Sequence, residues 1–166
     1  MHPIVRFALL YSLVPMLIAA CAAQSFDIGR ADRTVTPREA AERFAMVRDR
    51  QIAWGGTVVA VKNLSNGTQL EVLGYPLDDN NRPNTRIDPV GRFIVLHSGY
   101  LESVDYKAGR LVTVVGTATE TRNGTIGEAK YVYPVVSSKQ LHLWPVADPT
   151  PSNPNIHFGI GIGIVH

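Results

Sequence analysis

Residues 52–75, IAWGGTVVAVKNLSNGTQLEVLGY, decide the fold. β-Branched and aromatic residues dominate both halves of this stretch, as they do in β-strands. Gly55 and Gly56 interrupt the first half, as a bulge or a sharp bend would. Asn66-Gly67 lies between the two halves and is a hairpin signal. We therefore predict two antiparallel strands, of which the first is long and bent.

Three further runs have the composition of strands. The segment between the first two of them, residues 98–106, lacks alternation and is predicted to be a short helix or a turn. Asn123-Gly124 is a second hairpin signal, and Pro134 predicts a bend or break in the last run. The predicted strands cover residues 92–97, 111–120 and 127–144.

A helix is predicted before the first strand. Residues 36–39, TPRE, form a capping box with proline at the first helical position. Ala40, Phe44 and Val47 are spaced so that they share one helical face. We expect this helix to end between residues 48 and 51.

The order of these elements predicts the fold class. Three strands in a meander, a connector and two more strands match a mainly β, OB-like barrel of five to six strands. The N-terminal helix completes this domain over residues 36–146. The alternative that we keep open is an irregular β-sandwich of six or seven strands. A length of 166 residues and an apolar content of 45% suit one domain with a packed core.

The N-terminus contains the only cysteine of the chain. Residues 1–20 have a short polar start and a long apolar run, as in a secretory signal peptide. Ile18, Ala19 and Ala20 then precede Cys21, which is the pattern of a bacterial lipobox. We therefore predict that Cys21 is acylated and begins the mature protein. The alternatives are an ordinary signal peptide and a buried core cysteine.

The ends of the mature chain differ from its middle. Residues 21–35 are predicted to be a lipidated tether, because they are small, polar and without periodicity. Residues 147–166 form a proline-rich linker and a tail in which glycine alternates with isoleucine. This tail is a candidate β-segment for a surface, a membrane or a partner. The alternatives are an extra edge strand and a disordered tail.

Motifs for chemistry are scarce. His97 and His142 are not paired at metal-ligand spacing, and alternation with leucine predicts that His142 faces solvent. No combination of nucleophile, base and orienting group is recognisable. We predict no enzyme, no metal and no cofactor. A catalytic site would require a cleft that brings His97 within hydrogen-bond reach of a carboxylate and a hydroxyl.

Binding to a partner is the remaining class of function. A net charge of +2, from 16 basic and 14 acidic residues, is too balanced to predict nucleic-acid binding. Trp54, Tyr75 and Trp144 are the candidates for a ligand or partner face on the barrel. An exposed cluster of Trp54 with a tyrosine would support such a face, and burial of the aromatic residues would count against it.

Several long stretches together resemble the Slp family of outer-membrane lipoproteins, which are starvation-inducible lipoproteins of Gram-negative bacteria. The resemblance covers about residues 36–146. The stretches are WGGTVVAVKNLSNGTQLEVLGYPLDDNNRPN (54–84), GRFIV (91–95), GYLESVDYKAGRLVTVVGTATET (99–121) and IGEAKYVYPVVSSKQLHLWP (126–145).

The resemblance implies a non-enzymatic protein that is anchored in outer-membrane lipid through Cys21. Residue 22 is alanine and not aspartate, which in lipoprotein sorting favours the outer membrane. We expect the periplasmic face, and a contribution to envelope integrity or to the stress and stationary-phase response. The alternative function is a periplasmic binding module for an oligosaccharide, a peptidoglycan fragment or an envelope protein.

Overall fold

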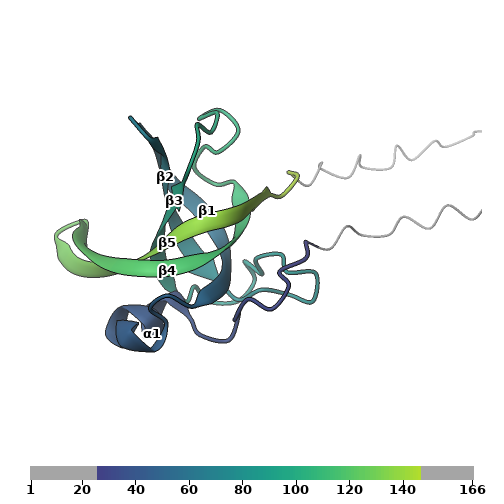
Figure 1. Cartoon of the computed structure of the whole chain (residues 1–166). Coiled ribbons are helices and arrows are strands. Elements are labelled where there is room, and N and C mark those ends of the chain that lie inside the picture. The colour runs from purple at the N-terminus through teal and green to yellow at the C-terminus, as the bar shows by residue number, and fades with distance from the viewer. Residues whose placement is uncertain (1–25, 147–166) are drawn as a thin grey trace, which may run out of the picture.

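The computed structural model describes residues 26–146 (Figure 1). The predicted signal peptide, Cys21 with its lipobox, and the Gly-Ile tail lie outside the described residues. The elements in chain order are α1 (Pro37–Glu42), a 3-10 turn (Phe44–Met46), β1 (Gln51–Leu64), β2 (Gly67–Tyr75), β3 (Gly91–His97), β4 (Leu111–Ile126) and β5 (Ala129–Leu143). No helix within this part of the chain is long and apolar enough to cross a membrane.

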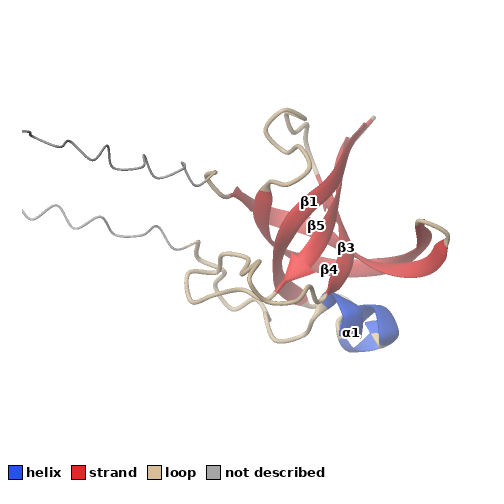
Figure 2. Cartoon of the chain, turned by 180° about the vertical axis from the view of Figure 1, so that it is seen from behind, coloured by secondary structure: helices blue, strands red, loops and turns tan. Residues whose placement is uncertain are grey.

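The five strands form one sheet that closes on itself in the order β1-β2-β3-β5-β4 (Figure 2). Every pair is antiparallel except β3 with β5, which pair in parallel over three positions, from Ile94↔Val135 to Leu96↔Ser137. The mainly β class and the predicted ring of five strands are thus confirmed, and the sandwich alternative is wrong. Closure explains this outcome, because it leaves few unpaired strand edges around the ring.

The glycine pair lies where β1 changes its neighbours. β1 pairs with β4 from Gln51 to Thr57 and with β2 from Gly55 onward, so Gly55 and Gly56 lie in the overlap. A Cβ atom on Gly56 would collide with the carbonyl oxygen of Leu73. The pair therefore permits close approach of β2. The bulge itself lies three residues later, between Val58 and Ala60.

The predicted capping box is present, but the helix is shorter than expected. The Thr36 hydroxyl accepts a hydrogen bond from the Glu39 amide, and the Glu39 carboxylate accepts one from the Thr36 amide. The helix ends at Glu42 because Arg43 leaves the helical region, with φ −133° and ψ 54°. Ala40 and Val47 are nevertheless fully buried in the barrel core. The expected helical face thus packs inward although a 3-10 turn replaces its second half.

The second hairpin turns later than predicted. Asn123 and Gly124 pair with Val132 and Tyr131 inside the β4–β5 ladder, so the Asn-Gly signal does not mark a turn here. The turn lies at Gly127-Glu128, where Gly127 has φ +58°. β4 therefore extends six residues past its expected end at residue 120, whereas β5 begins two residues later than expected. We call residues 119–134 the arm. Residues 98–106 contain turns and no helix.

Two small apolar clusters lie outside the barrel core. One joins the arm to β3 and consists of Ile94, Tyr133 and Val135, with Leu96, Ile126 and Tyr131 packed against them. The other joins the N-terminal segment to β1 and β4 and consists of Ala31, Ala53 and Val115, with Phe26, Ile28 and Leu77 packed against them.

The described part of the predicted tether lies on the barrel. Asp32 forms a parallel bridge with Ile52, in which the Asp32 amide donates to the Gln51 carbonyl at 3.0 Å. The Ala53 amide donates to the Asp32 carbonyl at 2.8 Å. Residues 26–35 therefore pack with the folded domain, whose expected start was residue 36.

Candidate functional site

A hollow of about 270 Å³ lies where the N-terminal segment crosses the end of the barrel. Arg33 to Pro37 form one wall, and β1 contributes Trp54 and Gly55. Tyr75 and Leu77, at and beyond the end of β2, form the other wall. This hollow brings together two of the three predicted ligand-face residues.

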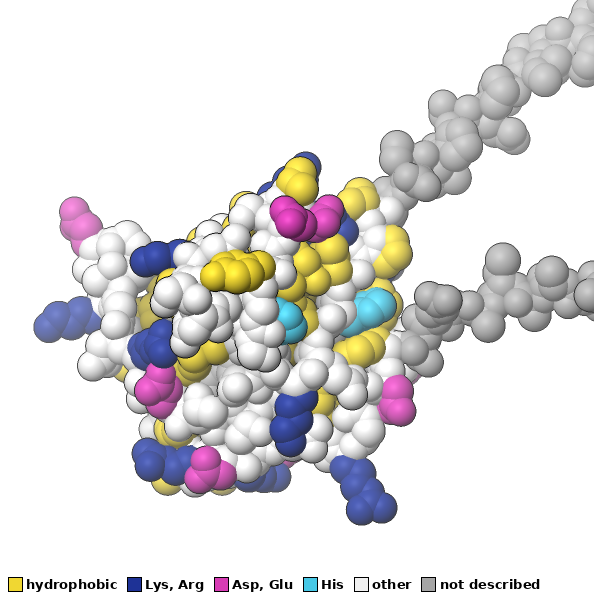
Figure 3. Space-filling model, turned by 45° about the horizontal axis from the view of Figure 1, so that its top comes forward, with side chains coloured by type: hydrophobic (Ala, Val, Ile, Leu, Met, Phe, Trp, Pro, Cys, Tyr) yellow, Lys and Arg dark blue, Asp and Glu magenta, His cyan; other side chains and the backbone are white. Residues whose placement is uncertain are grey.

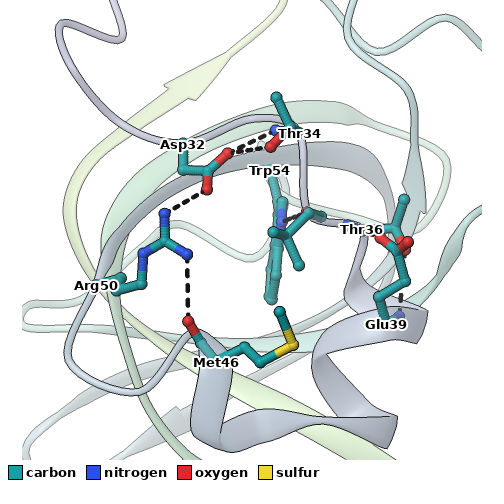
Figure 4. Close-up of polar contacts among 8 residues, drawn as sticks. Asp32, Thr34, Thr36, Glu39, Met46, Arg50 and Trp54 are labelled. Carbon is teal, nitrogen blue, oxygen red and sulfur yellow. Dashed lines mark hydrogen bonds and ion pairs between the residues drawn. The ribbon is translucent and has the colours of Figure 1, made fainter.

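Trp54 is a core residue at the floor of this hollow. Its side chain is 3% exposed and meets Phe93 edge-on, with 5.2 Å between ring centroids. The indole Nε1 donates to the Val35 carbonyl at 2.7 Å (Figure 4). Trp54 thus fixes the N-terminal segment on the barrel, and its polar atom already has a partner.

Tyr75 and Trp144 differ in position. Tyr75 is half-buried in the hollow, whereas Trp144 is 5% exposed and does not line it. Sugars and bases stack on exposed aromatic faces. Burial of both tryptophans counts against stacking on them, so a ligand at this face stays a prediction that rests on Tyr75.

The polar groups beside the hollow are engaged in structural contacts. The amide and hydroxyl of Thr34 donate to Asp32 Oδ1 at 2.8 and 2.6 Å, and Arg50 Nη2 donates to Asp32 Oδ2 at 2.8 Å (Figure 4). Arg50 Nη1 also donates to the Met46 carbonyl at 3.2 Å. The hydroxyl of Thr34, its amide and the Arg50 charge lower the pKa of Asp32 below its ordinary value. An ionised, fully bonded carboxylate of this kind holds a segment in place and is a poor general base.

His97 lies beside a second hollow of about 250 Å³ at the other end of β3. Its Nδ1 is 2.9 Å from the Ser138 hydroxyl. In the described chain, no carboxylate forms a hydrogen bond or ion pair with His97. Residues 26–146 also contain no group of three metal-binding side chains. A hydroxyl is therefore present at His97, but the carboxylate that a catalytic site would require is not.

An aromatic stack that the sequence did not reveal holds the first described residue. The rings of Phe26 and His142 are stacked, with centroids 5.0 Å apart, and His142 meets Trp144 edge-on at 4.4 Å. The Arg82 guanidinium lies 5.2 Å from the centre of the Trp144 ring. We call these four residues the aromatic clamp. Phe26 and His142 come from opposite ends of the domain, so no local pattern could have paired them.

The clamp is continued by hydrogen bonds. Asn81 Nδ2 donates to the Phe26 carbonyl at 2.8 Å, and Trp144 Nε1 donates to the buried Thr113 hydroxyl at 2.9 Å. That hydroxyl donates in turn to the Asn81 carbonyl at 2.8 Å. His142 is therefore half-buried in the clamp, and the expectation that it faces solvent is corrected.

Two curated proteins of Escherichia coli K12 are similar to the chain. It is 37% identical over 117 residues to the uncharacterized lipoprotein YeaY of Escherichia coli K12, covering 68% of this chain and 60% of that protein. It is 30% identical over 95 residues to the outer membrane protein Slp of the same organism, covering 57% and 50%. The matched region thus spans about half to three fifths of the length of these relatives.

Solved structures offer only distant likenesses. A small single-stranded DNA-binding protein from Streptomyces coelicolor is 14% identical, with a TM-score of 0.35 over 58% of this chain and 94% of that one. The Schizosaccharomyces pombe Pot1pC domain bound to single-stranded DNA is 10% identical, with a TM-score of 0.30 over 61% and 84%. Likenesses at this level carry no argument about this chain.

A protein-family model gives the broadest match. It is described as the outer membrane lipoprotein Slp family, and it matches residues 18–160. The match includes the predicted lipobox, all five strands and the aromatic clamp. The chain therefore belongs to the outer membrane lipoprotein Slp family.

Proposed function

We propose that this protein is anchored in the outer membrane by lipid on Cys21, faces the periplasm, and supports envelope integrity during stress without catalysing a reaction. The observation that carries the proposal is the family match, which begins at Ile18, the first residue of the lipobox. Membership of the family supports a lipoprotein of the outer membrane. The lipobox names the residue through which the lipid would attach.

The side-chain contacts support a role without catalysis. In the described chain, Asp32 is engaged by Thr34 and Arg50, and Glu39 is engaged by the helix cap. His97 contacts a hydroxyl but no carboxylate. Groups with these partners stabilise a fold, because a general base needs a free lone pair near the substrate.

Lipidation is tested by Cys21→Ser in a Gram-negative host supplied with labelled palmitate. We expect the unmodified chain to carry label and to fractionate with outer membranes, and Cys21→Ser to carry none and to leave the membrane. The matched control is Ala22→Ser, which changes the neighbouring residue and should behave like the parent chain. Unchanged sedimentation of Cys21→Ser with outer membranes would contradict the proposal.

The envelope role needs a separate test. In stationary phase, a strain without the gene should take up more of a dye that an intact outer membrane excludes than the parent strain does. The wild-type gene should restore the barrier and the Cys21→Ser gene should not, because the unanchored protein is no longer held at the membrane. Equal dye entry in all strains would contradict the stress role but not the proposed lipid anchor.

A further inference from the structure

The number of residues between Cys21 and the barrel limits how far the barrel can lie from its predicted lipid. Only residues 22–25 separate Cys21 from Phe26. An extended chain covers at most ~3.6 Å per residue, so Phe26 lies within about 18 Å of Cys21. Phe26 is itself held on the barrel by the stack on His142 and by the hydrogen bond from Asn81.

The clamp lies at one end of the molecule and the arm at the other. The purple and yellow ends of the described chain lie on one side in Figure 1, and the β4–β5 turn lies on the opposite side. Figure 2 shows the same arrangement from behind. From His142, β5 runs back to the turn over ~40 Å of strand at about 3.3 Å per residue. A lipid attached near Phe26 is therefore distant from the arm.

We propose that the clamp end rests on the phospholipid headgroups of the leaflet that holds acylated Cys21, and that the arm points away from the membrane. The surface concerned, which we call the anchor face, consists of Phe26, Asn81, Arg82, His142 and Val146, with the buried Trp144 ring packed against Arg82 and His142. This inference rests on the lipidation proposed above. It adds an orientation, because a protein on a long free tether would rotate above the membrane.

The side chains at this end suit a headgroup layer. Val146 is 67% exposed. Arg82 forms no ion pair within residues 26–146, so its guanidinium, which lies over the Trp144 ring, keeps N–H donors for lipid phosphates. Figure 3 shows hydrophobic side chains on the side where the described chain ends. Arginine is a residue type that favours membrane interfaces, because its long apolar stem can lie along the layer while the guanidinium reaches phosphates.

The orientation can be measured with single labels. Acylation would consume the only cysteine of the chain, so an introduced cysteine is the only free thiol. Val146→Cys and Glu128→Cys place a fluorophore on the anchor face and at the turn of the arm. The full lipidated chain is reconstituted in vesicles of phosphatidylethanolamine and phosphatidylglycerol that contain a lipid with a nitroxide on its headgroup.

We expect the label at residue 146 to be quenched several-fold more than the label at residue 128. Phe26→Ser should make the quenching at residues 146 and 128 more nearly equal, because it removes the ring that stacks on His142. The protein should stay on the vesicles. Phe26→Tyr keeps a stacking ring and is the matched control. If Phe26→Ser fails to fold by its thermal melt, His142→Ala tests the same contact from the half-buried partner.

Each remaining outcome decides the matter. Equal quenching of the two labels in the otherwise unmodified, vesicle-bound chain would overturn the orientation and leave the lipid anchor standing. If the ratio of quenching at residue 146 to quenching at residue 128 is the same in Phe26→Ser, His142→Ala and the parent chain, the role of the clamp is overturned. A free thiol at Cys21, with protein that does not float with vesicles, would overturn both the lipidation and this inference.

Discussion

Among the described glycines, Gly56 is the one at which an added Cβ would come closest to another atom. β1 pairs there with β2 and β4 at once, and an added Cβ would strike the backbone of Leu73. We expect Gly56→Ala to lower the free energy of unfolding by about 3 kcal/mol, since backbone atoms cannot move aside as a side-chain tip can. Chemical denaturation followed by tryptophan fluorescence measures the loss.

The matched control for this substitution is Gly29→Ala. Gly29 has φ +58°, but a Cβ there would meet nothing within 4 Å. This variant should lose only the ~1 kcal/mol of an alanine in the left-handed region. Equal losses at the two positions would show that backbone conformation, and not crowding, is what glycine provides in β1.

At the residue scale, sequence identified the special positions better than their surroundings. The glycine pair and the capping residues Thr36 and Glu39 were recognised because each depends on its own neighbours. For Trp54 and Trp144 the sequence left a ligand face and burial in the core both open, since composition does not say which face of a strand an aromatic residue occupies. What decides burial is the partner, and Val35 and Thr113 are distant in sequence.

At the scale of elements, Asp32 ties the N-terminal segment to the loop before β1. Its pKa is lowered from 3.8 by the Thr34 hydroxyl first, then by the Thr34 amide, with help from Arg50. The fold therefore favours the ionised form, so this stabilisation is present at neutral pH and is lost as pH falls below about 4. Asp32→Asn should cost at most ~1 kcal/mol at pH 7, because the pair with Arg50 is partly exposed.

The difference in free energy of unfolding between Asp32→Asn and the parent chain should shrink as the pH falls toward 3. Unfolding curves at several pH values measure it. Asp79→Asn is the control, because Asp79 is exposed and its carboxylate accepts no hydrogen bond among the described residues. A gap that is constant with pH would show that the Asp32 charge does not hold the segment.

The arm is a second element with its own support. Tyr133, a residue of the arm, has a buried side chain. Its hydroxyl donates to the Glu71 carboxylate at 3.3 Å or to the Thr125 carbonyl at 3.1 Å. Tyr133→Ala should cost about 3 kcal/mol. It should also speed amide hydrogen exchange in the arm more than in β1 and β2, because the apolar cluster of Ile94, Tyr133 and Val135 holds the arm and not the ring.

Val132→Ala is the matched control on the same arm. Its side chain is 39% exposed, so exchange in the arm should change little. If Tyr133→Ala speeds exchange equally in all strands, the arm is not a separate unit and unfolds with the barrel.

Element boundaries show where local signals fail. Asn123-Gly124 is a strong hairpin signal, yet the ladder continues through it to Gly127. The apolar cluster that joins the arm to β3 explains why the strands continue, because Tyr131 and Tyr133 reach β3 only if the strands extend past Asn123. The helix similarly ends early at Arg43, although its apolar spacing continues to Val47. Tertiary packing decided both boundaries.

At the scale of the whole molecule, residues 26–146 contain all five strands of the closed ring. Truncation after Pro154 removes the Gly-Ile segment and should leave the melting temperature unchanged, because the ring has no position vacant for another strand. Calorimetry of the two chains checks this. Loss of the cooperative melt would show that the Gly-Ile segment is part of the core.

The overall topology was more predictable than any single boundary. Strand order followed from the count and spacing of β-branched runs around Gly55 and Gly56, and only a few arrangements of such runs avoid open edges. The anchor face could not be predicted in the same way. It unites Phe26, the loop at Asn81 and the end of β5, which come together only after the ring closes.

Because the aromatic clamp joins the two ends of the domain, its formation depends on the order in which the chain is made and folds. Phe26 is among the first residues of the domain to be synthesised, and His142 is among the last. Contacts between distant segments must overcome the entropy of closing the intervening chain, so the clamp can form only once both ends of the domain are present. A chain that stalls before β5 docks has no surface on which Phe26 can stack. The clamp is thus a mark of completed folding.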